Sequence, residues 1–305
     1  TGALPGGIED GVDSEKVSNV GYNAKAGVGW DLAENGKVFF NAGYYSRQPY
    51  HDNIYLNYTN QVNPLTSNET ILGLEAGYSY SSPNFSANVN AYRTNWADRV
   101  VTSFNVQNDV VTFTTNEGVE QLHQGIEWDF DWKPQPDVPY TLTGFLSMGD
   151  WKYVGEALSR VTDEDQNVIS TSSSDVDGGE VGDAAQFTAG MGIDWQVAER
   201  LSMDSDVRFY DNLYADVGAV KENLKVPSYH VVDWGMSYKM YVGDEGGSLN
   251  VRVNINNLFD RVYINELRTN IAAEAGDETW NGVNVSNQGY FGLGRTWNVG
   301  LRYKF

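Results

Sequence analysis

The last fifteen residues read FGLGRTWNVGLRYKF, from Phe291 to Phe305, and they alternate with a period of two. The odd positions are apolar apart from Arg295, whereas the even positions are small or polar. A period of two is typical of a β-strand with one apolar face and one wet face. Tyr303 and Phe305 end the apolar face, and aromatic side chains at a strand end fit a membrane-interface girdle. The stretch therefore predicts a β-strand that faces lipid.

The same alternation recurs along the chain, separated by two kinds of connection. Tight turns such as Ala33-Glu34-Asn35-Gly36, in which Asn-Gly predicts positive φ, are each followed by a long excursion, and this order holds through ten connections. Antiparallel strands joined in this way place every tight turn on one rim and every long loop on the other. Eleven strands are predicted, at about residues 22–32, 38–44, 72–80, 85–91, 122–132, 140–151, 187–197, 201–209, 232–240, 249–255 and 291–305.

Segregation of loop lengths is typical of outer-membrane barrels, which have short periplasmic turns and longer extracellular loops. The predicted fold class is therefore all-β, an antiparallel transmembrane β-barrel. The alternative is a soluble β-sandwich, which also alternates but has no reason to segregate loop lengths or to load one end with Trp and Tyr. The aromatic residues predicted near the rim of tight turns are Trp30, Tyr78, Tyr80, Phe85, Trp128, Trp132, Trp195, Tyr241, Tyr303 and Phe305.

The odd strand count limits how the sheet can close. Eleven antiparallel strands cannot form a closed barrel, because two strand edges would stay unpaired in lipid. Either one strand escapes the pattern or the chain forms part of a larger barrel. In the second case, residues 1–19 are an extracellular loop and residues 20–305 the C-terminal portion of the barrel.

The composition narrows the possible partners. The 305 residues carry a formal charge of −21, with 20 Lys and Arg against 41 Asp and Glu. Nucleic acid is therefore excluded as a partner, since its binding needs clustered positive charge, and cations or neutral ligands are favoured. The chain has no Cys, hence no disulfide framework or thiolate metal site. No apolar run is long enough for a transmembrane helix, and a mean hydropathy of −0.45 suits a barrel in which alternate residues meet lipid.

Several motifs resemble TonB-dependent outer-membrane receptors. The closing motifs are Asn256-Asn257-Leu258-Phe259-Asp260 with Tyr263, then FGLGRTW from Phe291 and GLRYKF from Gly300. Asn63-Pro64-Leu65 with Glu69 resembles the family's entry into its later hairpins. Three further motifs resemble the Bacteroidetes branch: Gly182-Asp183-Ala184-Ala185-Gln186, Tyr214-Ala215-Asp216 and Pro227-Ser228-Tyr229.

This resemblance implies a 22-stranded barrel in the bacterial outer membrane, filled by an N-terminal plug that a TonB-type protein engages. Eleven strands are half of that number, and neither plug nor coupling box is recognisable in this chain. The implied partners are the rest of the barrel, the plug, the TonB-type energy-coupling protein and outer-membrane lipid. The implied function is active import of a scarce ligand captured at extracellular loops. A passive porin, a structural barrel subunit and a soluble carbohydrate-binding protein are the alternatives.

Two sets of residues are candidate sites. Carboxylates in a Gly-rich loop could hold Ca²⁺, which takes several oxygen ligands, although a solvated acidic loop is the commoner explanation of such a cluster. Aromatic side chains and a histidine in the long loops could stack on a ligand, or could merely pack the loops. The candidate metal ligands are Asp175, Asp177, Glu180 and Asp183, and the candidate ligand-binding residues are His51, Tyr55, Tyr58, Trp280 and Tyr290.

No catalytic constellation is apparent. The three histidines lie on separate predicted strands or loops without a neighbouring nucleophile motif, and Gly292 and Gly294 lack the third glycine and helix of a phosphate loop. An enzyme is therefore not predicted, and no cofactor is expected beyond a possible Ca²⁺ in the acidic loop.

Overall fold

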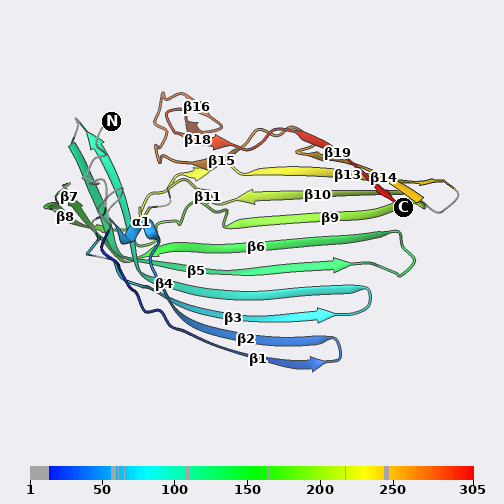
Figure 1. Cartoon of the computed structure of the whole chain (residues 1–305), viewed down its shortest axis with the longest axis horizontal. Coiled ribbons are helices and arrows are strands. Elements are labelled where there is room, and N and C mark those ends of the chain that lie inside the picture. The colour runs from blue at the N-terminus through cyan, green and yellow to red at the C-terminus, as the bar shows by residue number, and fades with distance from the viewer. Residues whose placement is uncertain are drawn as a thin grey trace.

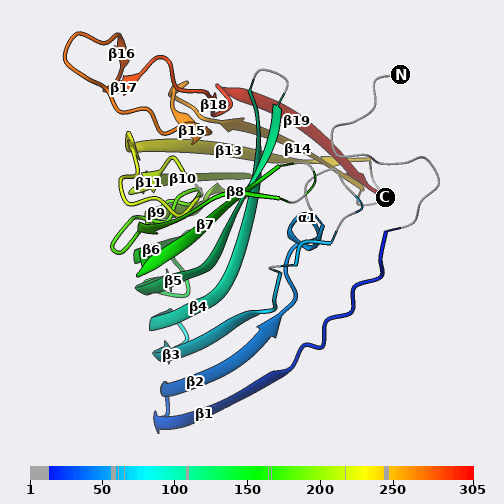
Figure 2. The ribbon, with the colours of Figure 1, turned by 90° about the vertical axis from the view of Figure 1, so that its left-hand side faces the viewer.

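Most of the chain forms one antiparallel sheet of thirteen strands that curls into an open trough (Figures 1 and 2). The computed structural model describes residues 14–55, 60, 62–64, 66–107, 110–163, 165, 167–216, 218–243 and 247–305. Thirteen of the nineteen residues predicted as an N-terminal loop, residues 1–13, and most of the predicted turn from Gly243 to Gly247 lie outside this part. Among the described residues, no helix is both long and apolar enough to span a bilayer.

Eleven strands form the wall of the trough, as the alternation predicted. They follow one another in the order β1-β2-β3-β4-β5-β6-β9-β10-β13-β14-β19, and β7 and β8 extend the sheet beside β5. The wall strands are β1 (Asn23–Ala33), β2 (Gly36–Arg47), β3 (Glu69–Ser81), β4 (Phe85–Gln107), β5 (Val110–Trp132), β6 (Tyr140–Val154), β9 (Phe187–Ala198), β10 (Leu201–Asp211), β13 (Tyr229–Val242), β14 (Gly247–Asn256) and β19 (Thr296–Lys304).

The remaining elements all belong to the long excursions. In Figure 1 the excursions lie at the left end of the trough, and the tight turns and the C-terminus lie at the right, so the two kinds of connection occupy opposite rims as predicted. The excursion elements are α1 (His51–Ile54), β7 (Glu156–Thr162), β8 (Val168–Asp175), β11 (Leu213–Tyr214), β12 (Lys225–Val226), β15 (Ile264–Leu267), β16 (Thr279–Trp280), β17 (Val283–Asn284) and β18 (Gly289–Phe291).

The strand register gathers the apolar side chains on one face. Val38 pairs with Trp30 on one side and Tyr78 on the other, and Val253 pairs with Met236 and Val299. A side-chain period of two carries this match along every strand, so one register error would turn a whole strand inside out. Because these side chains stay exposed on the convex face, with Trp297 at 73% and Met191 at 56%, the face suits hydrocarbon rather than water.

Aromatic side chains accumulate on this face near the tight turns. Rings lie close to one another at Phe85 and Phe130 (centroids 6.4 Å apart) and at Tyr303 and Phe305 (4.8 Å). At the same rim, but with the opposite side-chain parity on β13, the ring of Tyr241 lies 4.8 Å from the Arg200 guanidinium. Such a band of aromatic residues with nearby cations is the arrangement expected at a membrane interface.

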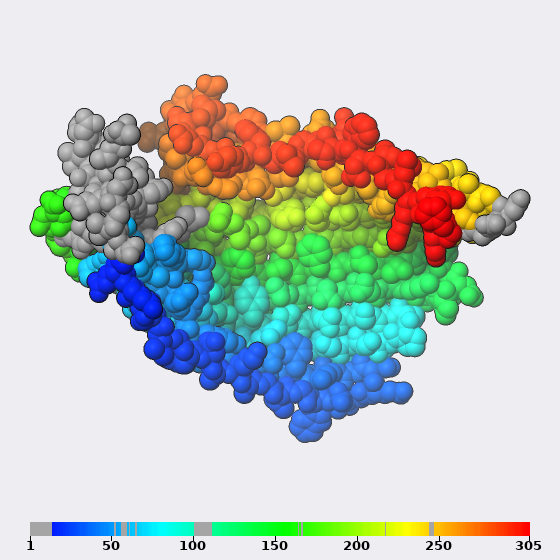
Figure 3. All heavy atoms as spheres, in the orientation of Figure 1, coloured from blue at the N-terminus to red at the C-terminus, as the bar shows by residue number. Residues whose placement is uncertain are grey.

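The opposite, concave face is polar. Figure 3 looks into this hollow, whose two side walls are formed by the first and last strands. Arg252 pairs with Asp204 at 2.8 Å, and Arg208 bridges Asp206 and Asp233. The register places these residues on the concave face.

The prediction for the last strand is wrong at its start. Phe291 ends β18, where it pairs with Ile264, and the wall strand begins only at Thr296. Between them, the Arg295 N–H donates to Asp260 at 2.8 Å and the Asn257 amide donates to the Leu293 carbonyl at 3.2 Å. The backbone of residues 292–295 is therefore held by the preceding excursion, although the alternation in the sequence runs on unbroken.

The sequence also predicts a long excursion from Asp98 to Gly118 with its own small hairpin, Val101 to Phe104 and Val110 to Phe113. The hairpin forms, with Phe104 paired with Phe113, but the segment is not separate from the wall strands. Both β4 and β5 continue through it and reach 23 residues each. Their register shifts near Arg99, and Asp98 and Gly118 adopt φ of 60° and 65°. These irregularities interrupt the sequence pattern while the strand pairing continues, which is how β-bulges and bends act.

The first tight turn forms where predicted, but for a different reason. Neither Asn35 nor Gly36 has positive φ. A Cβ at Gly36 would lie 2.5 Å from the Tyr78 hydroxyl oxygen, so this glycine makes room for the aromatic belt instead of supplying an unusual backbone angle.

Candidate functional site

The predicted loop aromatics fall into two groups at opposite ends of the strand order. His51 and Tyr55 lie at α1, between β2 and β3, with ring centroids 5.4 Å apart. The Tyr55 hydroxyl donates to the Glu15 carbonyl at 2.8 Å, which ties α1 to the start of the described chain. Tyr58 lies outside the described residues.

Trp280 and Tyr290 lie in the excursion between β14 and β19. Trp280 packs edge-on against Phe291 (5.2 Å) and against a small core that includes Leu213 and Val283. Tyr290 is half exposed beneath the Arg268 guanidinium at 5.1 Å. Of this pair, Tyr290 is the side chain left open to a ligand, whereas Trp280 holds the excursion together.

The acidic candidates are dispersed among other partners. Asp175 binds Lys221, Asp177 accepts the Gly155 N–H at 3.1 Å, and Glu180 accepts the Gln186 amide at 3.1 Å. Asp183 is exposed in a turn with φ of 70°. Nowhere in the described part of the chain do three acidic, His or Cys side chains group as metal ligands, so the structure does not bring these four together.

A hollow of about 940 Å³ lies on the concave face of the wall. It spans β1 to β6, and the sequence pattern gave no sign of it, because its residues come from six strands. The residues that give it its character are Lys25, Asn41, Tyr45, Glu75, Asn90, Tyr92, Trp96, His123, Glu127 and Trp151.

Stacked rings form one wall of the hollow. The His123 and Trp151 rings are almost parallel, with centroids 5.1 Å apart, and Trp96 lies 6.4 Å beyond His123. The Trp151 indole N–H donates to the Tyr92 hydroxyl at 2.8 Å. Three residues of adjacent strands thus present neighbouring aromatic rings, of which the parallel pair His123 and Trp151 suits a flat ligand face.

Glycines allow these rings to lie close to the sheet. A Cβ at Gly149 would meet the Trp151 indole nitrogen at 2.6 Å, and one at Gly125 would meet the Tyr92 hydroxyl at 2.6 Å. Because glycine has no Cβ, each ring folds down over the neighbouring backbone and the space above it stays open.

The floor of the hollow is acidic. Glu75 accepts hydrogen bonds from Asn41 and Asn90, each at 3.0 Å, and Asn90 also donates to Glu127 at 3.3 Å. Two carboxylates against the single ammonium of Lys25 give the site a negative balance. Neutral or cationic ligands therefore fit better than anionic ones, in agreement with the net charge of the chain.

The outer edge of the hollow has the opposite sign. Glu69 is 2% exposed and lies between Arg47 (3.8 Å) and Arg99 (3.5 Å). Arg99 also donates to Gln121 at 2.7 Å. A buried carboxylate held by two arginines joins the end of β2 and the start of β3 to β4, and so keeps the edge of the hollow in place.

This curved antiparallel wall, with lipid-type side chains outside and polar ones inside, defines an outer-membrane barrel protein. The chain belongs to the TonB dependent receptor-like, beta-barrel family, whose model matches residues 5–258. Barrels of this family reside in the bacterial outer membrane and are transporters, not enzymes. No curated protein matches the chain.

Several solved structures share the fold. The siderophore receptor PiuA from Acinetobacter baumannii has a TM-score of 0.61 at 17% identity, with 92% of this chain and 35% of that chain covered. Copper transporter OprC has a TM-score of 0.60 at 16% identity (91% and 38% covered), and BauA, the ferric preacinetobactin receptor from Acinetobacter baumannii, has 0.59 at 19% (92% and 36%). The chain spans a little over one third of the length of each.

Proposed function

We propose that this chain is the C-terminal half of a TonB-dependent transporter barrel of the Bacteroidetes type, with residues 20–305 in the wall. The two free edges support this: β1 and β19 each have one neighbouring strand among the described residues. Unpaired strand edges are not tolerated in hydrocarbon. Strands from outside the chain would therefore pair with both, and an N-terminal plug would fill the hollow interior.

The assembled protein would import a scarce ligand against its gradient. Capture would begin at the outer rim, where His51, Tyr55 and Tyr290 are placed, and would continue at the stacked rings of the concave hollow. The observation that carries this proposal is the hollow itself, because a wall that merely enclosed water would need no ordered aromatic surface. The TonB-type protein would supply the energy through the plug.

A growth experiment separates active import from the alternatives of a passive porin or a structural subunit. Deletion strains are compared on single sources of iron, cobalamin, peptide and glycan, with and without the TonB-type coupling protein. The expected result is a growth defect on one source, reproduced when the coupling protein is lost. Uptake that persists without the coupling protein would assign the chain to a passive porin, and no defect on any source would favour a structural subunit.

The stacked rings can be tested once that source is known. Trp151→Ala removes one ring of the stack, and an aromatic contact contributes about 1 kcal/mol, so we expect binding to weaken about fivefold. Trp297→Ala, on the convex face of β19, is the matched control and should bind as the wild type does. Equal affinities for all three proteins would place the ligand elsewhere.

A further inference from the structure

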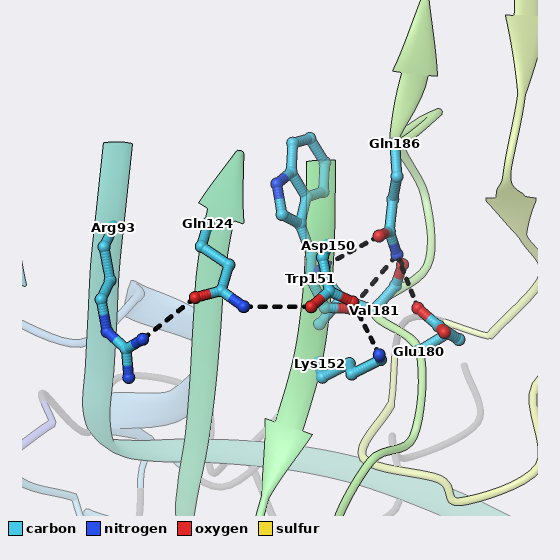
Figure 4. Close-up of polar contacts among 8 residues, drawn as sticks. All are labelled: Arg93, Gln124, Asp150, Trp151, Lys152, Glu180, Val181 and Gln186. Carbon is cyan, nitrogen blue, oxygen red and sulfur yellow. Dashed lines mark hydrogen bonds and ion pairs between the residues drawn. The ribbon is translucent and has the colours of Figure 1, made fainter. Parts of the chain in front are cut away.

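The convex face carries one connected row of polar side chains. Arg93 of β4, Gln124 of β5 and Asp150 of β6 are paired in register at positions where the alternation points outward. Arg93 donates to the Gln124 carbonyl oxygen at 3.0 Å, the Gln124 amide donates to Asp150 at 3.1 Å, and Lys152 pairs with Asp150 at 2.7 Å (Figure 4). We call these four residues the outward polar row.

The row lies at the outer boundary of the apolar band. Arg93 is eight residues beyond Phe85 of the aromatic belt (93 − 85 = 8), which at about 3.4 Å per residue and a tilt of about 40° is roughly 20 Å along the membrane normal. The apolar band of such barrels is about 25 Å tall. The row is therefore at the depth where lipid headgroups begin.

Exposed apolar side chains lie directly below the row. Ile126 and Met148 are paired in register one step closer to the tight turns, and they are 46% and 42% exposed. Beside the row, Leu74, the register partner of Arg93 on β3, is also apolar and 38% exposed. Together, a polar strip above and an apolar strip below match a molecule with a polar head and acyl chains.

The charges of the row leave one cation without an anion. Asp150 is already paired, since its two carboxylate oxygens accept from Lys152 and Gln124. Glu180, a carboxylate beyond Lys152, is also already engaged, because it accepts a hydrogen bond from the Gln186 amide. Arg93 is exposed and, within the described chain, has no ion-pair partner, so most of its donors point to the surroundings. A guanidinium at a headgroup layer favours phosphate, which its planar donors match in shape.

We propose that the outward polar row binds the phosphate-bearing headgroup of an outer-leaflet lipid. Arg93 holds the phosphate, Gln124 and Lys152 contact the rest of the polar head, and the acyl chains lie over Ile126 and Met148. The site depends on the placement of the wall in the membrane and not on which ligand the protein imports. A test of this lipid site is therefore independent of the proposed uptake function.

The test uses the full-length receptor in nanodiscs of phosphatidylcholine with or without phosphatidylglycerol. Native mass spectrometry counts the lipids retained after release into detergent. Removing one cation near a lipid surface costs about 1 kcal/mol, so Arg93→Gln should retain phosphatidylglycerol about fivefold more weakly. Retention by Arg93→Lys should lie between that of the wild type and that of Arg93→Gln, because lysine keeps the charge but lacks the planar donors. Arg302→Gln, which changes the same charge on the concave face of β19, should match the wild type.

Three outcomes would overturn the proposal: equal retention by wild type and Arg93→Gln, no preference of the wild type for phosphatidylglycerol, or a photo-cross-linker at position 93 that captures a polypeptide in place of lipid. If the Arg93→Gln variant does not assemble into a folded barrel, the lipid site is tested with the wild type alone. Its retention of phosphatidylglycerol must fall as salt rises, and retention independent of salt would reject the site.

Discussion

Wall strands and outer-rim excursions point their apolar side chains in opposite senses. On β9 and β19, large apolar side chains such as Met191 and Trp297 are exposed on the convex face. In the excursions, by contrast, a set of apolar side chains is buried together, in the core of Leu213, Ala215, Val226, Ile264, Leu267 and Val283. The difference indicates two environments. Hydrocarbon contacts the convex face of the wall and accommodates its exposed apolar side chains, whereas the excursions bury apolar surface from water as a soluble domain does.

The strongest test of this contrast is a charge on the convex face. Met191 is 56% exposed on β9, midway between the belt residue Trp195 and the outer end of the strand. If lipid covers this face, Met191→Arg should destabilise the folded barrel by about 2–4 kcal/mol, the cost of arginine near the bilayer midplane. The measurement is the urea midpoint of the full-length protein folding into lipid vesicles.

A matched change on the concave face sharpens that result. Thr188 is on the same strand with the opposite side-chain parity, so Thr188→Arg should shift stability by no more than about 0.5 kcal/mol. If the two variants lose the same stability, lipid does not distinguish the faces, and a soluble sheet would be the better description of the wall.

The second test concerns the seam where an excursion joins the wall. Gln186 is 3% exposed. Its side-chain oxygen accepts a hydrogen bond from the backbone N–H of Trp151 at 2.8 Å, and its side-chain amide donates to the backbone carbonyl of Trp151 at 3.1 Å. The side chain thus replaces a backbone partner at the residue just before β9 begins, as Figure 4 shows. Gln186→Leu leaves buried groups unpaired and should cost about 2–3 kcal/mol.

Limited proteolysis can show which segment of the chain loses stability in this variant. In Gln186→Leu, cleavage should increase within residues 176–186, which this seam holds against β6, while the rest of the wall stays protected. Gln196→Leu, near the exposed turn between β9 and β10, is the control and should behave as the wild type does. Uniform loss of protection along the chain would mean that the excursion and the wall do not unfold separately.

The same contrast explains what the sequence could predict. A wall strand has a local signature, since every second residue meets lipid, and eleven strands with their rims followed from it. The excursions have no such period. Gln186 and Asn257 hold the excursions through hydrogen bonds from their side chains to backbone groups. The sequence alone does not distinguish a buried amide side chain from an exposed one. The concave hollow needs His123 and Trp151 from different strands, so it appears only when the register is known.

The smallest effect is expected for the ion pair of Asp175 and Lys221, which lies in the excursions and is open to water. The bond from Lys221 and the Asp177 N–H lower the pKa of the Asp175 carboxyl below its ordinary value of about 3.9. Because the folded pKa is the lower one, the pair stabilises the fold above that ordinary value, and the contribution disappears as pH falls through the folded pKa. Asp175→Asn should therefore lower the urea midpoint slightly at neutral pH and not at all once the pH has fallen below the folded pKa. Asp165→Asn, whose carboxylate has no ion-pair partner in the described chain, should be neutral at both. A large loss in Asp175→Asn would mean that water does not reach this excursion as freely as the exposure of the pair indicates.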